Sequence, residues 1–407
     1  MHKRPLLSIV VPTHNRSQYA EHCIESLLAI DSHVIEVIVT DTSTDQKLSQ
    51  ILQSRRTDLL EDPRLVYRQI DEPSSLTKNN NAAMSLATGE FVCLIGDDDC
   101  VTNFALDAAR WASSNGANVI SQTISSNYAW PDFRSRLAGA GHAGNLYLPR
   151  RIKRPKRRNA RKDLQRGLER ALQGTDHMPR CYHGIVRREI LEQVRNLAGE
   201  YFLGSSPDMS GAVSIACVIE DYYEVDLPLT ITGASAGSNS GRSAMNTHKG
   251  SLSSESQTSA FRNSDWTDGV PRFFSVESVW AHAGLKSLSK LKPDMVTNFN
   301  YARLLALCSI RHPEYRAAVA AATQEVKLLR PNMATSISRQ IAWEKLKERA
   351  SRLSYLLKRG LIPTASGGRK HVKSLLNIAQ ALQAFETEFS KVKISFADYM
   401  NTVDEKS

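Results

Sequence analysis

Three consecutive carboxylates, Asp97-Asp98-Asp99, directly follow the continuous apolar run Phe91–Ile95. Adjacent carboxylates repel one another, so such a cluster beside a buried strand is costly unless a positive charge lies among them. A hard divalent cation meets this need, because Mg²⁺ and Mn²⁺ take oxygen ligands and bridge protein carboxylates to phosphates. The pattern therefore predicts a metal site at a strand end, with a solvated acidic turn as the structural alternative.

Two further polar clusters follow apolar runs in the same way. Pro12-Thr13-His14-Asn15 follows Leu6–Val11, and Thr40-Asp41-Thr42-Ser43 follows Val34–Val39. In an open parallel sheet, ligands bind outside the carboxyl ends of the strands. We therefore expect all three clusters to meet at one edge of a sheet.

The elements that must position these clusters alternate along residues 1–126. Apolar runs predict strands that are covered on both faces, and the segments between them have helical spacing. Ser17, Thr77 and Asn103 stand where side chains commonly cap helices. Repeated strand–helix–strand units predict an α/β fold, Rossmann-like, with a mostly parallel sheet and helices on both faces.

After residue 126 the predicted strands and helices no longer alternate regularly. Residues 127–175 are predicted to be a basic insertion, and residues 176–260 return to mixed structure. Within the latter, the stretch 233–260 is rich in Ser, Gly and Asn and predicts a loop that closes over a ligand. Residues 261–407 have a helical pattern, which predicts an all-helical C-terminal domain after a first domain that covers residues 1–260.

One helix of that C-terminal region has a predicted apolar face. Its members recur at helical spacing, which favours packing in a bundle, with docking on a membrane surface as the alternative. They are Trp343, Leu346, Ala350, Leu353 and Leu357.

The composition excludes several classes of protein. No run of eighteen apolar residues is present, so a membrane-spanning helix is not predicted. The six cysteines are scattered and form no Cys-x-x-Cys pair, which favours a reduced, cytoplasmic protein without a zinc site.

The positive charge is concentrated in one segment. Residues 150–170 contain eleven Lys or Arg and two Asp or Glu, a net +9 (11 − 2) of the chain's +10. Such a segment binds anionic lipid headgroups, binds nucleic acid, or is a solvated helix. Because the segment has no aromatic residue for stacking on bases, nucleic acid is disfavoured, and we expect an anionic membrane surface, at the inner face of the plasma membrane.

Taken together, the motifs resemble the family 2 glycosyltransferases of GT-A fold, of the bacterial surface-polysaccharide type. The resemblance rests on Ser8–Arg16, Val39–Asp45, Asn81–Glu90 and Gly96–Asp99, in that order. It implies an inverting enzyme that moves a sugar from a nucleotide-sugar, with UDP favoured, to a hydroxyl of a glycan or lipid-linked acceptor. It also implies Mn²⁺ or Mg²⁺ as the cofactor.

The resemblance also implies roles for single residues near the predicted sheet edge. The nucleotide-sugar would lie against the loops after the first two strands and the start of a helix, and Asp41 would bond the base. Asp97 would lie near the ribose, and Asp98 would ligate the metal with help from Asp99. The implied nucleotide-sugar residues are Pro12, Thr13, His14, Asn15, Asp41, Lys78, Asn81, Asp97 and Asp98.

A second group of residues is implied on the acceptor side. Transfer to a hydroxyl needs a base, and Asp208 resembles the family's carboxylate for this role, with Glu220 and Asp221 as competitors. His183 is expected to line the acceptor pocket. His248, in the Ser/Gly/Asn-rich stretch, is a further candidate near the metal, although a single His is more often not a ligand.

Two other functions remain open at this point. A non-catalytic nucleotide-sugar-binding or scaffold protein would keep the fold, but the carboxylates at Asp97–Asp99 and Asp208 disfavour it. A nucleotidyltransferase also uses paired carboxylates, but it needs a Gly-rich, basic loop after its first strand. Pro12-Thr13-His14-Asn15 has neither property.

Overall fold

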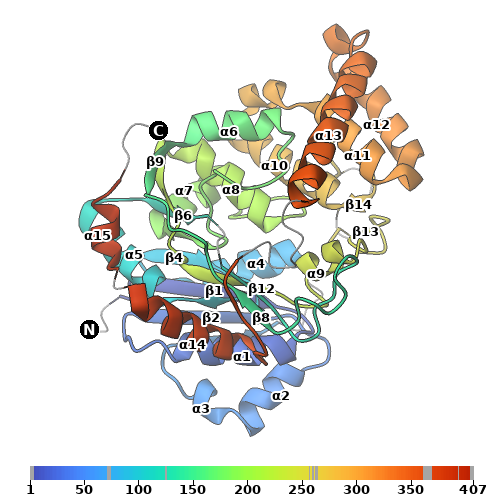
Figure 1. The fold of residues 1–407 in the computed structure, drawn as a ribbon. Coiled ribbons are helices and arrows are strands. Elements are labelled where there is room, and N and C mark those ends of the chain that lie inside the picture. The colour runs from blue at the N-terminus through green and yellow to red at the C-terminus, as the bar shows by residue number, and fades with distance from the viewer. Residues whose placement is uncertain are drawn as a thin grey trace.

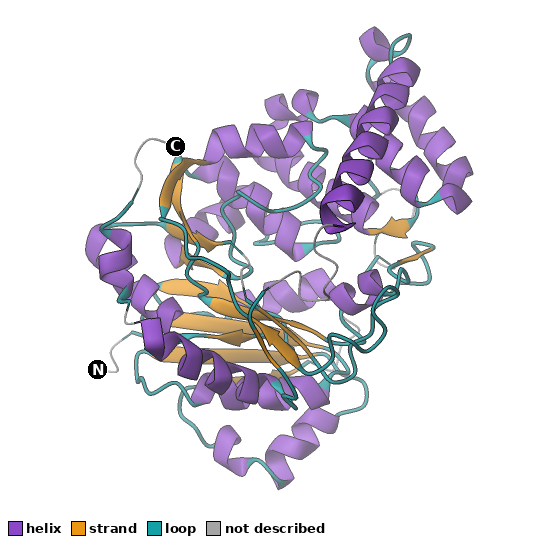
Figure 2. Ribbon diagram, viewed as in Figure 1, coloured by secondary structure: helices purple, strands orange, loops and turns teal. Residues whose placement is uncertain are grey.

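The computed structural model describes residues 4–70, 75–123, 126–255, 257–258, 261, 265–360, 369–392 and 394–403. Strands form a central layer between helices on either side (Figure 2). None of the helices in these ranges is long and apolar enough to cross a bilayer.

An eight-stranded sheet is the centre of the fold. Its strands are β1 (Leu7–Thr13), β2 (Ile35–Asp41), β3 (Leu65–Gln69), β4 (Phe91–Leu94), β6 (Val119–Gln122), β9 (Lys156–Asn159), β10 (Gly184–Arg187) and β11 (Asp221–Val225). Their order across the sheet is β3-β2-β1-β4-β10-β6-β11-β9. Strands β3, β2, β1 and β4 are parallel, so their carboxyl ends meet at one edge.

Alternation along the strands explains why helices cover both faces. In β1, Ile9 and Val11 belong to one core and Val10 to the other, because successive side chains point to opposite faces. The helices that contribute to the Ile9 core include α1 (Ser17–Leu28), α2 (Lys47–Ser54), α3 (Thr57–Leu60) and α5 (Asn103–Asn115). Those of the Val10 core include α4 (Leu76–Ser85), α6 (Ala160–Glu169), α7 (Arg188–Ala198) and α8 (Pro207–Val218). The predicted α/β class with a mostly parallel sheet is confirmed.

The predicted helix caps were wrong. Ser17 and Asn103 are the first residues of their helices, after Arg16 and Thr102, and neither of these makes a side-chain cap bond. The cap of α4 is Ser75, whose hydroxyl accepts from the backbone N–H of Lys78, rather than Thr77. Thr77 instead donates to the carbonyl of Gly204.

A second sheet joins distant parts of the chain. Its strands are β5 (Cys100–Val101), β7 (Asn127–Ala129), β8 (Asn145–Tyr147), β12 (Thr230–Ala234) and β15 (His371–Val372). Their order is β15-β8-β7-β12-β5. The residues 127–175 therefore contribute strands to both sheets, since β9 is the edge of the first sheet.

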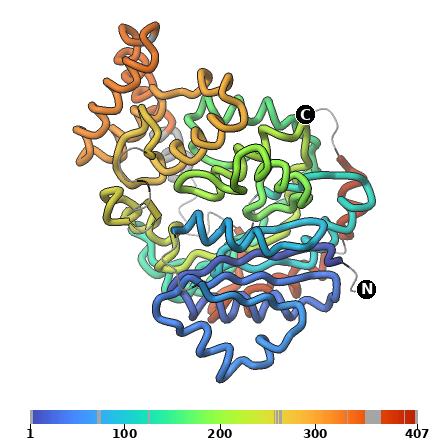
Figure 3. The backbone as a smooth tube through the Cα atoms, turned by 180° about the vertical axis from the view of Figure 1, so that it is seen from behind, coloured from blue at the N-terminus to red at the C-terminus, as the bar shows by residue number. Residues whose placement is uncertain are grey.

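The C-terminal region is mostly helical and contacts the first domain in several places. Its elements are β14 (Phe274–Ser275), α10 (Val276–Leu291), α11 (Tyr301–Arg311), α12 (Arg316–Leu329), α13 (Ile337–Gly360), α14 (Ile378–Phe389) and α15 (Phe396–Met400), with short 3-10 helices at Pro293–Asn298, Pro313–Tyr315, Pro331–Met333 and Ser390–Val392. Helix α10 packs on α8, while α14 lies beside α1 and α15 beside α5 (Figure 1). Helices α11–α13, orange in Figure 3, lie away from the blue N-terminal elements.

The predicted apolar face of α13 is not a bundle face where the structure describes it. Trp343 and Leu346 are 58% and 57% exposed. Helix α13 instead turns Glu344 and Glu348 toward Arg303 of α11, at 3.4 and 2.8 Å. The side chains of Leu353 and Leu357 lie outside the described residues.

Candidate functional site

A cavity of 1260 Å³ opens at the carboxyl ends of β1, β2 and β4. We call the part of its lining that comes from segments 12–16, 42–46, 75–80 and 94–98 the first wall. The second wall is the part that comes from Tyr182, Gln257 and the segments 206–208, 233–255 and 276–280. Segment 233–255 contains α9 (Asn239–Ala244) and β13 (Lys249–Gly250). The stretch predicted as a closing loop thus contributes much of the second wall.

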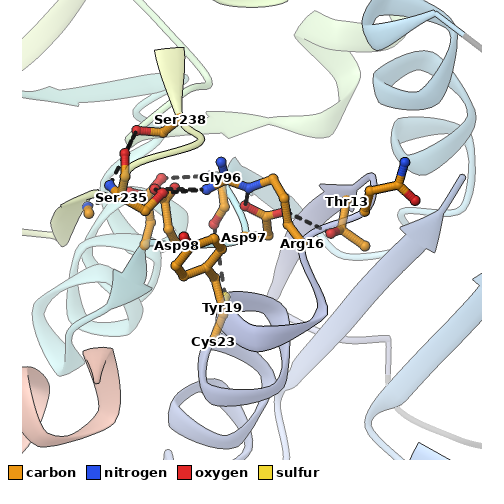
Figure 4. A network of polar contacts seen from close by, with 12 residues as sticks. Thr13, Arg16, Tyr19, Cys23, Gly96, Asp97, Asp98, Ser235 and Ser238 are labelled. Carbon is orange, nitrogen blue, oxygen red and sulfur yellow. Dashed lines mark hydrogen bonds and ion pairs between the residues drawn. The ribbon is translucent and has the colours of Figure 1, made fainter. Parts of the chain in front are cut away.

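Asp97 and Asp98 lie at the cavity and share one cation. Arg16 donates from Nε to Asp97 at 2.7 Å, and its Nη2 lies 2.9 Å from Asp98 Oδ2 (Figure 4). Thr13 donates its hydroxyl to Asp97 at 2.6 Å. Burial raises the pKa of Asp97, and the Arg16 guanidinium opposes this shift. The side chains after β1 and β4 are therefore joined into one polar network.

Asp99 is turned away from that network. Its two carboxylate oxygens accept from the backbone N–H groups of Gly96 and Gly233, each at 2.6 Å. Burial and the neighbouring charge of Asp98 raise the pKa of Asp99 well above its usual range. Asp99 thus fastens the Asp97–Asp99 turn to β12, and Asp98 is the carboxylate that lines the cavity with Asp97.

The donor set at this turn fits a divalent cation of the Mg²⁺ or Mn²⁺ type. Carboxylate oxygens are the ligands that these ions take, and Mg²⁺ usually binds one or two carboxylates together with substrate phosphates and water. Among the described residues, no cluster of three or more His, Cys, Asp or Glu side chains forms a closed metal site. Asp97 and Asp98 at the cavity suit a metal that binds together with a diphosphate.

The loop after β1 is fixed to the loop after β2. His14 Nδ1 lies 2.8 Å from the carbonyl of Thr42, and Asn15 accepts from the N–H of Thr44 at 2.9 Å. The Asn15 backbone also donates to Ser43 at 2.7 Å. Pro12, Thr13 and His14 line the cavity, whereas the side chain of Asn15 holds the two loops together.

Three further residues of the predicted site have different positions. Lys78 is exposed and lines the cavity. Asp41 is buried and accepts from Ser43 N–H and from Tyr67 hydroxyl, each at 2.8 Å. Asn81, in the middle of α4, bonds the backbone of Phe202 and the Glu200 carboxylate instead. Asp41 and Asn81 thus lie outside the cavity lining.

Asp208 lines the second wall in the first turn of α8, after Pro207. One of its oxygens accepts from Met209 N–H at 2.8 Å and from the Ser206 hydroxyl. These bonds fix the carboxylate at the helix start, where negative charge is favourable. The competing carboxylate Asp221 lies on β11 and pairs with Arg157 instead.

The two histidines expected near the site differ in exposure to the cavity. His183 is buried behind Tyr182, with Nδ1 at 2.8 Å from Thr230 and Nε2 at 3.4 Å from Asp99. Burial lowers the pKa of His183 to about 3, so the ring is neutral and this approach is not an ion pair. His248 lines the second wall, and its Nδ1 lies 3.0 Å from Ser243 Oγ.

Sequence reasoning missed several residues at the cavity. Arg16 directly follows the first polar cluster, Pro12-Thr13-His14-Asn15, so its position could have marked it. Asn79 donates to the Thr13 carbonyl at 3.0 Å and accepts from Thr40 at 2.7 Å, so it ties α4 to β1 and β2. Trp280 and Ser235 reach the cavity region from distant parts of the chain, and no local pattern marks them.

The fold is an α/β domain with a cavity at the carboxyl ends of parallel strands, the place where open sheets of this kind bind ligands. Residues 8–195 match the family described as "Glycosyl transferase family 2". The match covers 188 of the 407 residues and agrees with the family that the motifs resemble.

Curated proteins that are similar to this chain are named as glycosyltransferases. The chain is 40% identical over 101 residues to an Escherichia coli K12 protein named as a colanic acid biosynthesis glycosyl transferase, WcaA, a match that covers 24% of this chain and 34% of the relative. It is 30% identical over 113 residues to the GalNAc(5)-diNAcBac-PP-undecaprenol beta-1,3-glucosyltransferase of Campylobacter jejuni, with coverage of 28% and 36%. The match thus spans about a third of the length of both curated relatives.

A solved structure is also similar in arrangement. The crystal structure of residues 1–349 of Staphylococcus aureus TarS in complex with UDP-GlcNAc aligns with a TM-score of 0.45 and 18% identity. The alignment covers 85% of this chain and 92% of that one.

Proposed function

We propose that this chain is a metal-assisted, inverting glycosyltransferase that moves a sugar from a nucleotide-sugar to an acceptor hydroxyl. The observation that carries the proposal is that Asp98 and Asp208 both line one cavity. The match of residues 8–195 to the glycosyltransferase family 2 model supports it.

The first wall would bind the nucleotide and the second wall the acceptor. Pro12, Thr13 and His14 offer a loop fixed by hydrogen bonds, against which a base can lie. Lys78 offers a cation for the diphosphate. Asp98, with Asp97, would hold Mn²⁺ or Mg²⁺, and such an ion offsets the charge that develops on a leaving diphosphate.

Asp208 would act as the general base. A hydroxyl is a weak nucleophile, and a carboxylate that accepts its proton in the transition state lowers the barrier. The acceptor oxygen would then attack the anomeric carbon as the bond to the diphosphate breaks, in a single displacement with inversion. The fixed position of Asp208 at the start of α8 suits this role, because its oxygen is held by Met209 N–H.

We further propose a UDP-sugar as donor and a lipid-linked glycan as acceptor. The relative from Campylobacter jejuni, named for a PP-undecaprenol acceptor, supports the acceptor class. An anionic membrane surface is the proposed partner of the basic segment. Seven of its cations are exposed and form no ion pair within the described residues: Arg150, Arg151, Lys153, Arg154, Arg161, Lys162 and Arg170.

Release of nucleoside diphosphate tests the proposed activity. The protein is incubated with Mn²⁺ and a panel of UDP-, GDP- and dTDP-sugars, and the freed diphosphate is quantified with and without lipid-linked acceptors. We expect release from one donor class, faster with acceptor, and loss of release in Asp98→Ala. A folded protein that turns over none of the donors would contradict the proposal and favour a binding or scaffold role.

Cosedimentation with vesicles tests the membrane partner separately. We expect binding to vesicles with phosphatidylglycerol, weakening with salt, and no binding to phosphatidylcholine alone. The double variant Arg161→Glu/Lys162→Glu should bind less, whereas Lys345→Glu/Lys347→Glu on α13 serves as the control. Equal binding of all variants would contradict the role of residues 150–170.

A further inference from the structure

Arg16 occupies a specific place among the carboxylates of the cavity. Its guanidinium spans Asp97 and Asp98, with Nε at 2.7 Å from one and Nη2 at 2.9 Å from the other. The side chain is 18% exposed, and its guanidinium carbon lies 4.7 Å from the centre of the Tyr19 ring. The aromatic face and both carboxylates therefore hold one orientation of the guanidinium.

The position of Arg16 conflicts with simple binding of a divalent cation. Asp98 Oδ2 accepts from the Ser235 hydroxyl at 2.6 Å and pairs with Arg16, so this oxygen already has two partners. A divalent cation that ligates the same oxygen would lie within a few ångströms of the guanidinium. Like charges that close repel each other, and one of the two must leave Asp98.

The same contacts reach the second wall. Arg16 donates to Ser235 at 2.8 Å, and Ser235 follows β12 directly (Figure 4). Ser238, the cap of α9, donates to the carbonyl of Ser235 at 2.9 Å. A change at Asp98 therefore acts on the segment that leads into α9, which lines the cavity.

We infer that Arg16 is a positioning residue that occupies the cation place at Asp98 until a nucleoside diphosphate arrives, and then releases Asp98 to the metal. This inference rests on the proposed metal-assisted function. Because Arg16 also lines the cavity, its guanidinium can pair with the diphosphate after it leaves Asp98. Metal and nucleotide would thus bind with strong positive coupling, and the metal alone would bind weakly.

Binding of Mn²⁺ alone tests this role without any transfer reaction. Free Mn²⁺ is measured by electron paramagnetic resonance with wild type, Arg16→Gln and Arg16→Lys, each with and without UDP. We expect Arg16→Gln to bind Mn²⁺ about tenfold more tightly than wild type without UDP, because a competing cation is gone. The increase in Mn²⁺ affinity caused by UDP should be smaller in Arg16→Gln than in wild type.

Further variants keep the test decisive. Arg16→Lys retains the positive charge, but a single ammonium cannot pair with both carboxylates as the guanidinium does. The Mn²⁺ affinity of Arg16→Lys should therefore lie between those of wild type and Arg16→Gln. Arg16→Lys also serves as the test variant if Arg16→Gln misfolds. Adding Asp98→Asn to Arg16→Gln should abolish the gain. Arg110→Gln on α5 is the control, because Arg110 is exposed and ion-paired with Asp107. Its Mn²⁺ affinity should equal that of wild type.

Two outcomes separate this inference from the proposed function. Unchanged or weaker Mn²⁺ binding in both Arg16 variants would overturn the inference, even if wild type binds nucleotides as proposed. Tighter Mn²⁺ binding in Arg16→Gln, with no nucleotide bound by any form of the protein, would support the countercharge role of Arg16 and contradict the proposed function.

Discussion

The two walls of the cavity are built in different ways. The first wall consists of short loops that directly follow parallel strands, together with the start of α4, and hydrogen bonds such as that from Thr44 to Asn15 join neighbouring loops. The second wall collects the start of α8, the segment after β12 and the start of α10, which are far apart in sequence. The first wall is thus fixed by the sheet itself, whereas the second depends on how separate segments pack onto it.

The largest expected effect concerns Asp208 on the second wall. Asp208→Asn keeps the size of the side chain but removes the base, so transfer should fall by about 10²–10⁴-fold while donor binding is retained. The rate is measured by diphosphate release with acceptor, and donor affinity by calorimetry. Asp398→Asn is the matched control, because Asp398 also lies in the first turn of a helix and accepts from a nearby serine. Full transfer activity in Asp208→Asn would exclude the base role.

The contact between β12 and the Asp97–Asp99 turn, where the two walls meet, should lose stability when a methyl group is added at Gly233. A Cβ at Gly233 would lie 1.8 Å from the Asp98 carbonyl oxygen, so Gly233→Ala must shift the Asp97–Asp99 turn or β12. We expect a loss of about 3 kcal/mol in the free energy of unfolding, measured by urea denaturation. At Gly237 the nearest atom is Arg16 Nη1 at 3.6 Å, so Gly237→Ala should be nearly neutral. Equal stability of the two variants would contradict the packing at this junction.

The packing of α10, which carries part of the second wall, should weaken in acid. Glu277 in its first turn pairs with His312 at 2.8 Å and Arg311 at 2.9 Å. Burial raises the pKa of Glu277, but the hydrogen bond and charge of His312, with Arg311, outweigh it and lower the pKa to about 2. A pKa below the unfolded value stabilises the fold at pH above about 4.5, and this contribution is lost as pH falls toward about 2.

Glu277→Gln removes that pH-dependent contribution. At pH 7 the variant should be less stable than wild type by about 2 kcal/mol, and the difference should shrink as pH falls from about 5 to about 3. Thermal unfolding at a series of pH values measures both quantities. A stability difference that stays constant over this range would argue against the Glu277–His312 pair as its source.

The smallest expected effect is a weaker affinity for the acceptor when Trp280 is replaced. This half-buried side chain lines the second wall with Val276 and Val279, and its ring offers a flat apolar surface to a sugar. Trp280→Ala should raise the KM for the acceptor about tenfold and leave donor affinity unchanged. Trp343→Ala, at an exposed position on α13, is the control. A rise in the KM for the donor instead would contradict the assignment of Trp280 to acceptor binding.

The difference between the walls also explains what the sequence could predict. The strands, the parallel edge and the cavity position of Thr13, Asp97 and Asp98 follow from apolar runs that end in polar clusters, which is local information. The direction of a buried polar side chain is not local. Besides local backbone partners, Asp41 accepts from Tyr67 on β3 and Asp99 accepts from Gly233 on β12, and only the packing of these strands supplies those partners.

Ion pairs explain why the predicted apolar face of α13 was wrong. The apolar spacing of α13 predicted burial of Trp343, but Glu348 makes ion pairs with Arg303 and Arg311, at 2.8 and 2.9 Å, and these turn the charged side of the helix inward. The positions of Arg303 and Arg311 on α11 become relevant only once α11 and α13 pack together. Trp280 was missed for the same reason, because its role depends on the packing of α10 on α8.

The most direct test of the account is calorimetric binding of UDP, GDP, CDP and dTDP, with and without Mn²⁺, to wild type and Asp98→Ala. We predict tight binding of one diphosphate, with UDP favoured, that requires Mn²⁺ and is lost in the variant. Binding of none of these nucleotides by the folded wild-type protein, or binding that Asp98→Ala leaves intact, would contradict the assignment of the first wall as a metal-assisted donor site.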